Sequence, residues 1–202
     1  MDNKPEQRPR TAFISGPLEP GQDYFRTHYE ARIREAIAAG DAFVMGPAEG
    51  MDTMARNFLL DEAAVAPERV TVYFSEQQVL WDPELAALKA RVERLGGHVV
   101  VEGMSTGVRD AAMTRDSDYD ILRYMSVEEQ KAFYGKRYFP RVSNTEKNER
   151  RRLGLPLHVN HERDKVDQAR LAADESGKDS RNGALATWKK GVSNMVNRVR
   201  ST

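Results

Sequence analysis

The sequence predicts an α/β fold, in which a mostly parallel sheet of about five strands carries helices on both faces and an α-helical C-terminal extension follows. Short apolar, β-branched runs alternate with segments whose apolar residues recur at spacings of three and four. Gly or Gly-Pro turns separate several of these segments. The alternation stops near residue 125, and the remaining sequence is charged and helical in pattern.

The first strand and helix set the pattern. Residues 1–10 are polar and predict a disordered lead-in, whereas the apolar run 11–15 predicts a buried strand that ends at Gly16. Residues 23–39 predict a helix because its apolar side chains fall on one face, and Gly40 ends it. Those side chains belong to Phe25, Tyr29, Ile33, Ala36 and Ile37.

The same pattern continues to residue 125. Further strands are predicted at 42–45, 70–74, 98–101 and 119–125. Helices are predicted at 51–63, 83–95 and 108–117. Because crossovers between parallel strands are right-handed, we expect residues 11–125 to form one Rossmann-like domain.

The remaining residues, 126–202, are predicted to form a charged helical extension. Its helices are expected at 127–134, 144–153, 161–173 and 184–199. Residues 1–140 contain 17 Lys and Arg against 23 Asp and Glu, a formal charge of −6, whereas residues 141–202 contain 14 against 8, a charge of +6. The basic part is either a solvated extension or a docking element for an acidic partner, nucleic acid, its own chain or a second copy.

Two of these partners can be weighed from the sequence. No aromatic stacking platform is interleaved with the basic residues, so we do not expect nucleic acid to be a partner. The last predicted helix has one apolar face, which favours core docking or a homo-oligomer over a membrane surface.

Composition limits the class of protein. The chain of 202 residues suits about one domain with an extension, and the absence of cysteine excludes disulfides, thiolate metal sites and cysteine nucleophiles. There is no signal-peptide pattern and no apolar run near 20 residues, so we expect a cytoplasmic protein without membrane contact. The four His residues lack metal-ligand spacing, and we expect neither a metal nor a cofactor.

The segment 43–58 contains the most informative loop. An apolar run breaks into a turn bounded by Gly46 and Gly50 and then restarts with helical spacing. Such glycines let main-chain N–H groups point at a phosphate, and Asp52 and Thr53 stand where a helix N-cap is expected. The loop lacks the Lys of a Walker motif, so a ligand-binding loop and a plain connection both remain open.

Other strand ends carry similar polar turns. Ser15 and Gly16 end the first strand, and Ser105, Thr106 and Arg109 follow the fourth. These groups could contact a phosphate or ribose, although an ordinary turn and a solvated arginine are the alternatives. Because ligands of open α/β sheets bind outside the carboxyl ends of the strands, we expect these turns to share one crevice with residues 46–53 and 74–78.

Carboxylates near this crevice are candidate catalytic groups. Glu49 is the first choice because it lies inside the Gly-bounded loop, and Glu102 is the second. A pair of carboxylates would suit cleavage of an N-glycosidic bond through an oxocarbenium-like transition state. For each residue a structural or solvent-exposed role is the alternative, and Asp52 also competes as a helix cap.

Three motifs occur in order at these strand ends. They are Phe-Ile-Ser-Gly at 13–16, Gly-Pro-Ala-Glu-Gly-Met-Asp-Thr-Met-Ala at 46–55, and Arg-Asp-Ala-Ala-Met at 109–113 with Asp118. Together they resemble the SLOG superfamily of Rossmann-like nucleotide-binding proteins, related to the DprA and LOG groups. The middle motif is similar to the family signature GGARGAD-x-x-A, and the last to RN-x-x-M-x-x-x-AD. Over residues 11–125 the resemblance implies recognition of a nucleotide or nucleotide-derived ligand, with contacts from Ser15, Gly16, Gly46, Gly50, Asp52 and Arg109.

Departures from the family pattern bear on the chemistry. Pro47 replaces the second glycine, Glu49 the arginine and Asp110 the asparagine, so the phosphate contacts differ. The PGGxGTxxE signature of the cytokinin-activating phosphoribohydrolases is missing, whereas the nucleoside deoxyribosyltransferases look similar in fold and use a carboxylate nucleophile. Three hypotheses follow: a nucleotide-binding module, a nucleotide N-glycosidase, and a non-catalytic scaffold that assembles through its helical tail.

Overall fold

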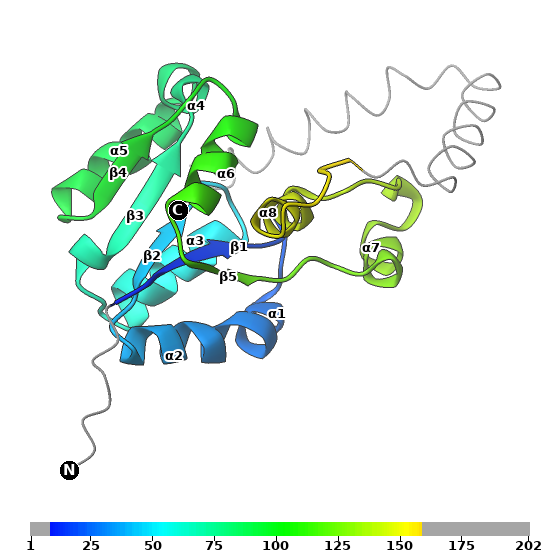
Figure 1. Ribbon diagram of the computed structural model, residues 1–202, viewed down its shortest axis with the longest axis horizontal. Helices are drawn as coiled ribbons and strands as arrows, with labels where there is room; N and C mark the ends of the chain where they lie inside the picture. The colour runs from blue at the N-terminus through cyan, green and yellow to red at the C-terminus, as the bar shows by residue number, and fades with distance from the viewer. Residues whose placement is uncertain (1–8, 159–202) are drawn as a thin grey trace, which may run out of the picture. The chain divides into compact units, whose positions relative to one another are not determined.

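A five-stranded parallel sheet in the order β4-β3-β2-β1-β5 forms the frame of the structure, a computed structural model (Figure 1). Its strands are β1 (Thr11–Ser15), β2 (Ala42–Met45), β3 (Val70–Phe74), β4 (His98–Val101) and β5 (Tyr119–Leu122). All five coincide with predicted strands, and only β5 is shorter than expected. The predicted α/β class with a Rossmann-like parallel sheet is therefore confirmed.

The structure describes residues 9–158. Of these, 9–136 and 142–158 belong to one compact unit, and 137–141 belong to a second. Most of the predicted lead-in and the helices predicted at 161–173 and 184–199 lie outside the described residues. The sheet, the site and all proposals below concern the first unit.

Helices fill the connections between the strands and follow the last strand. Between β1 and β2 lie α1 (Gln22–Phe25), the π-helical η1 (Arg26–Glu30) and α2 (Ala31–Ala38); between β2 and β3 lie α3 (Met51–Asn57), the π-helical η2 (Phe58–Glu62) and the 3-10 helix η3 (Pro67–Arg69). Later come α4 (Glu76–Trp81), α5 (Pro83–Arg94), α6 (Thr106–Arg115), α7 (Val127–Tyr134), the 3-10 helix η4 (Gly135–Arg137) and α8 (Asn144–Arg152).

Helix α4 was not predicted from the apolar periodicity. It has six residues and no buried side chain, so it has no apolar stripe that could reveal it. Its first turn is fixed by a capping box, in which Ser75 Oγ accepts from the Gln78 main-chain N–H at 3.4 Å and Gln78 Oε1 accepts from the Ser75 N–H at 2.9 Å. The Ser-x-x-Gln spacing was therefore the available signal.

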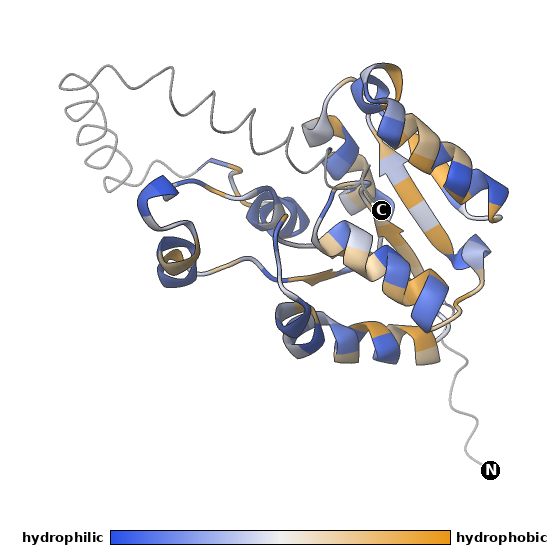
Figure 2. Cartoon of the chain, turned by 180° about the vertical axis from the view of Figure 1, so that it is seen from behind, coloured by the Kyte–Doolittle hydropathy of each residue, from blue (hydrophilic) through white to orange (hydrophobic). Residues whose placement is uncertain are grey.

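The sheet carries a large apolar core on one face and a small one on the other. On the first face, side chains such as Tyr29, Ile33 and Phe58 pack against alternate strand residues that include Ile14 and Phe43. The opposite face is covered by α6, whose Ala112 and Met113 pack on Phe13, Val44 and Tyr73. In Figure 2 the helices carry both hydrophobic and hydrophilic residues, as expected for helices that bury one side against the sheet.

This division follows from the order of the strands. The chain steps from β1 to β4 in one direction and then returns to place β5 on the other side of β1. Right-handed crossovers put the helices of the two directions on opposite faces. The order reverses at β1, so the carboxyl end of this strand is the expected position for a ligand site.

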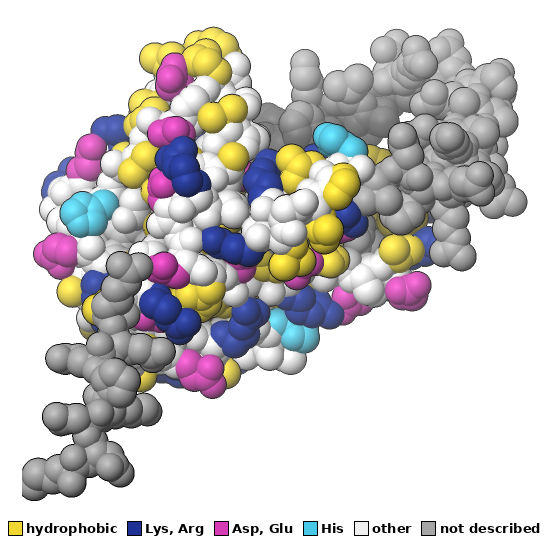
Figure 3. All heavy atoms as spheres, viewed as in Figure 1, with side chains coloured by type: hydrophobic (Ala, Val, Ile, Leu, Met, Phe, Trp, Pro, Cys, Tyr) yellow, Lys and Arg dark blue, Asp and Glu magenta, His cyan; other side chains and the backbone are white. Residues whose placement is uncertain are grey.

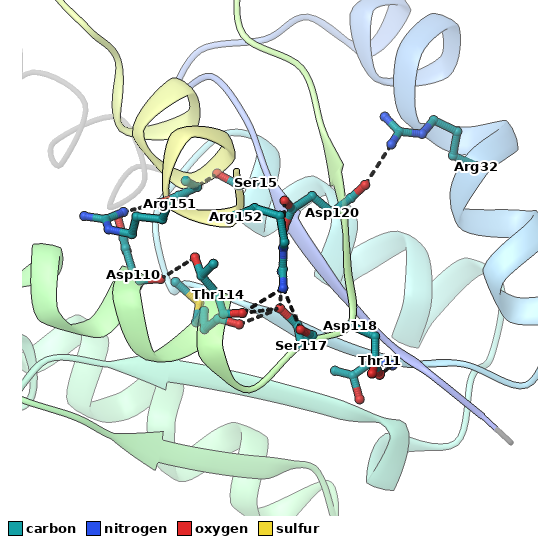
Figure 4. A network of polar contacts seen from close by, with 12 residues as sticks. Thr11, Ser15, Arg32, Asp110, Thr114, Ser117, Asp118, Asp120, Arg151 and Arg152 are labelled. Atoms are coloured by element: carbon teal, nitrogen blue, oxygen red, sulfur yellow. Dashed lines mark hydrogen bonds and ion pairs between the residues drawn. The ribbon is translucent and has the colours of Figure 1, made fainter. Parts of the chain in front are cut away.

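Helix α8 packs against α6 and β5 through Arg152 (Figure 4). Its Nη1 donates to the main-chain oxygens of Thr114 at 2.8 Å and Ser117 at 2.6 Å. Nη2 donates to Ser117 Oγ at 2.6 Å and Asp120 Oδ1 at 2.8 Å, and Nε donates to Asp120 Oδ2 at 3.1 Å. One guanidinium thus satisfies the carbonyls at the end of α6 and pairs with a mostly buried carboxylate of β5.

We expect Arg152→Ala to lower the free energy of unfolding by about 2–3 kcal/mol, because it leaves the Asp120 carboxylate and the Ser117 carbonyl without their partner. The control is Arg150→Ala, whose guanidinium bonds Glu146 on its own helix and the Pro156 carbonyl oxygen. That change should lower it by less than about 1 kcal/mol. Urea unfolding of both variants measures the difference, and equal losses would contradict the role assigned to Arg152.

Candidate functional site

A pocket lies at the carboxyl ends of β1 and β2, on the face of the sheet covered by α6. Four segments line it: Phe13, Ser15, Gly16 and Leu18; Gly46, Ala48, Glu49 and Asp52; Arg109, Asp110 and Met113; and Asn144, Thr145 and Asn148. Its cavity volume is about 60 Å³. Because small-molecule pockets usually measure roughly 300–1,000 Å³, this cavity encloses only one end of a nucleoside-sized ligand.

The end of β1 supplies one wall of the pocket. Ser15 Oγ accepts a hydrogen bond from Asn148 Nδ2 of α8 at 3.0 Å, although the two residues are far apart in sequence. The Ser15 main-chain oxygen accepts from the hydroxyl of Tyr29 at 2.9 Å. A Cβ on Gly16 would lie 2.5 Å from that hydroxyl and 2.6 Å from Met51 Cγ, so only glycine allows this approach.

The loop after β2 has a different helix start from the predicted one. The N-cap of α3 is Gly50, not Asp52 or Thr53, and α3 begins at Met51. The physical reason is the left-handed backbone of Gly50, with φ 78°, where a Cβ would collide with the main-chain carbonyl of Leu18.

Asp52 and Thr53 instead brace the loop from the first turn of α3. The main chain of Ala48 lies close enough to the carboxyl of Asp52 to lower its pKa. Thr53 Oγ1 donates to the Ala48 carbonyl oxygen at 3.0 Å. Both side chains therefore interact with the main chain of Ala48 inside the loop.

A cluster of charged side chains forms the floor of the pocket. Arg109 and Asp110 are buried, with 7% and 4% of their surfaces exposed. Arg109 donates from Nε and Nη2 to Asp110 Oδ1 at 3.0 and 2.6 Å, and from Nη1 to Gln78 Oε1 at 3.0 Å. A Cβ on Gly46 would lie 2.6 Å from Asp52 Oδ2 and 3.4 Å from Arg109 Cζ, so a glycine here lets both side chains approach the main chain.

Asp52 is the acid whose proton affinity is most altered in this cluster. Burial raises the pKa of its carboxyl to about 7, and the nearby charge of Asp110 acts in the same direction. Arg109, the Ala48 N–H and Arg56 oppose the rise. The side chain still lines the pocket, so a group with this pKa faces the space where a ligand would lie.

The structure brings six of the predicted site residues to the pocket and leaves five outside its lining. Ser15, Gly16, Gly46, Glu49, Asp52 and Arg109 line it, whereas Gly50, Thr53, Glu102, Ser105 and Thr106 do not. Glu49 is exposed to solvent. Gly50 and Thr53 lie outside the lining but shape the loop after β2.

The other three residues follow β4, which is the edge strand. Two strands separate β4 from β1, so their ends lie about 14 Å apart at the usual strand spacing. Glu102 Oε1 lies 3.5 Å from Arg115 Nη1. Ser105 Oγ caps α6 by accepting from the Val108 N–H at 3.4 Å. Thr106 is the exposed first residue of that helix. Arg109 reaches the pocket because it lies one turn further along α6.

Helix α8 contributes pocket residues that sequence reasoning did not single out. Asn144, Thr145 and Asn148 belong to a charged segment with no motif spacing and no strong apolar stripe. The packing of α8 against α6 and β5 brings them to the pocket. A local sequence pattern does not report that kind of placement.

No known protein family, curated protein or solved structure matches this chain. No helix within residues 9–158 is long and apolar enough to cross a membrane. In the same part of the chain, no group of three or more His, Asp or Glu side chains is arranged to hold a metal ion. On the face drawn in Figure 3, basic and acidic side chains are interspersed.

The pKa of Asp52 makes stability depend on pH. An unfolded Asp titrates near 3.9, so between about pH 4 and pH 7 the native carboxyl holds a proton that the unfolded chain has lost. The stabilisation of the folded state by this protonated carboxyl is fully present below about pH 4 and is lost as pH rises through 7. We expect the advantage of the wild type over Asp52→Asn to fall by up to about 1.4 kcal/mol per pH unit from pH 5 to 7 and to level off above 8. Urea unfolding across this range checks it; parallel curves would show that Asp52 titrates normally.

Proposed function

We propose that this pocket binds a nucleotide or a nucleotide-derived ligand. The observation that supports the proposal is the convergence of three separate strand-end motifs on one space. Ser15 and Gly16 come from the first motif, Gly46 and Asp52 from the second, and Arg109 from the third. Their meeting at the strand where the sheet order reverses fits the general position of ligand sites in open α/β sheets.

The shape of the pocket suggests how such a ligand would lie. The enclosed end is polar, and carboxylates with amide and hydroxyl groups suit the hydroxyls of a sugar. Leu18 lines the same pocket and is 64% exposed, so it offers an apolar contact for a base at the open side. In this arrangement the sugar reaches Asp52 and the base remains near the mouth.

Cleavage of the N-glycosidic bond is the second candidate function, and the chemistry of Asp52 favours it. An acid with a pKa near 7 is present in both protonation states at neutral pH, which suits general acid–base catalysis. Asp110 supplies a second carboxylate on the floor, and Glu49 remains a candidate at the exposed side.

Glu102 lies outside the pocket lining and is not part of this proposal. The scaffold role, the homo-oligomer and the cytoplasmic location stay predictions from the sequence.

Binding and cleavage are separated by one panel experiment. The protein is incubated with nucleosides, nucleoside monophosphates, NAD and ADP-ribose, while its melting temperature and the release of free base are followed. A ligand at about 100 times its dissociation constant should stabilise the fold by about 2.7 kcal/mol, which shifts the melting temperature by several degrees. Absence of both a shift and a product would refute binding and cleavage together.

Variants identify the group responsible for any cleavage. If Asp52 acts as the acid or nucleophile, Asp52→Asn should lower base release at least about 100-fold, the usual contribution of general acid–base catalysis, while the ligand-induced shift persists. Glu49→Gln tests the exposed alternative. Glu84→Gln, an exposed carboxylate in the first turn of α5, serves as the control. Release that is lost only in Glu49→Gln would assign the chemistry to Glu49 and not to Asp52.

A further inference from the structure

We infer that the pocket selects an uncharged, hydroxyl-bearing ligand, so that it takes a nucleoside in preference to the corresponding phosphate ester. This inference rests on the proposed function and names the class of ligand within it. It narrows what the family resemblance implies, a nucleotide or nucleotide-derived ligand, to a nucleoside.

The charges that line the pocket are the first reason. The lining contains one cation, Arg109, and three carboxylates, those of Glu49, Asp52 and Asp110. Arg109 donates from all three of its nitrogens to Asp110 and Gln78. Its charge is thereby compensated. A phosphate entering the pocket would meet the carboxylate of Glu49, and that of Asp52 above its pKa of about 7, without a free cation in the lining.

The main-chain donors of the loop after β2 are the second reason. In phosphate-binding loops such N–H groups point at the ligand. Here the Asp52 carboxyl lies against the Ala48 main chain, which lowers its pKa, and the Met51 N–H donates to the Pro17 carbonyl at 3.1 Å. The side chain of Asp52 thus occupies part of the position that an anion would take in such a loop.

Two other basic side chains lie near the pocket without lining it. Arg151 does not line the pocket; its Nη1 donates to Asn148 Oδ1 at 2.6 Å and its Nη2 to the Gly107 carbonyl at 3.4 Å. Arg56 lowers the pKa of Asp52 but lines a separate small cavity between α3 and α5; its Nη2 donates to Thr53 Oγ1 at 3.2 Å, and its buried Nη1 has no hydrogen-bond partner within residues 9–158.

Hydroxyl groups, by contrast, find suitable partners. The carboxylates of Asp52 and Asp110 accept hydrogen bonds from hydroxyls, and carboxylates in this setting favour a donor over a second anion. Ser15 adds a hydroxyl to the lining, and Asn148, whose amide already bonds Ser15 and Arg151, holds that hydroxyl in place. A ribose without a phosphate satisfies these groups and brings no charge into the cavity.

Titration calorimetry on the full chain tests the inference with four nucleosides, their 5′-monophosphates, ribose and ribose 5-phosphate. At least one nucleoside should bind about tenfold or more tightly than its monophosphate at low salt, because a like-charge contact opposes the phosphate. The preference should shrink at high salt, where exposed charges are screened. It should also shrink in Glu49→Gln, while the remote control Glu84→Gln keeps it.

The outcomes separate the inference from the proposed function. A monophosphate that binds as tightly as its nucleoside, or more tightly, overturns the selectivity and leaves nucleotide binding in place. A preference that neither salt nor Glu49→Gln changes overturns its electrostatic cause. If no compound in this panel binds, the inference fails, and the panel with NAD and ADP-ribose described above decides the proposed function.

Discussion

A buried guanidinium needs acceptors, and in this protein that requirement organises the pocket and the residues around it. Arg109 lies on the covered face of the sheet with 7% of its surface exposed, where an unpaired charge would be strongly destabilising. Asp110 and Gln78 provide the acceptors, and Gln78 is held in the capping box that starts α4. The absence of a side chain at Gly46 leaves room for Arg109 and Asp52 together. The same burial that demands these partners raises the pKa of Asp52 to about 7.

Helix α8 completes the site, although it lies beyond the last strand of the sheet. Arg152 holds one end of the helix against the end of α6 and β5, and Asn148 bonds Ser15 at the end of β1. For this helix, the basic extension docks on the acidic part of its own chain. The small volume of the pocket is one consequence, because a wall made by α8 closes a crevice that an open sheet would leave exposed to solvent.

Much of the fold follows from local patterns, and much of the site does not. The five strands were predictable because each is a short, mostly apolar run between turns, and the long helices because one face carries the apolar residues. Helix α4 has no buried side chain and gave no such periodicity. The meeting of Ser15, Asp52 and Arg109 in one pocket followed from the rule that ligands of open α/β sheets bind at the carboxyl ends of the strands.

The same rule failed for Ser105 and Thr106 because it ignores the distance across the sheet from the edge strand β4 to β1. Asn148 could not be predicted because its position in the pocket depends on tertiary packing.

The perturbed pKa of Asp52 and its place in the ligand pocket are tested most directly by a carbon-13 NMR titration of its carboxyl, with and without a saturating nucleoside. We predict a pKa near 7 in the free protein and a changed carboxyl shift when the nucleoside is bound. A pKa near the ordinary value of about 3.9, with a carboxyl shift that no nucleoside alters, would contradict the account.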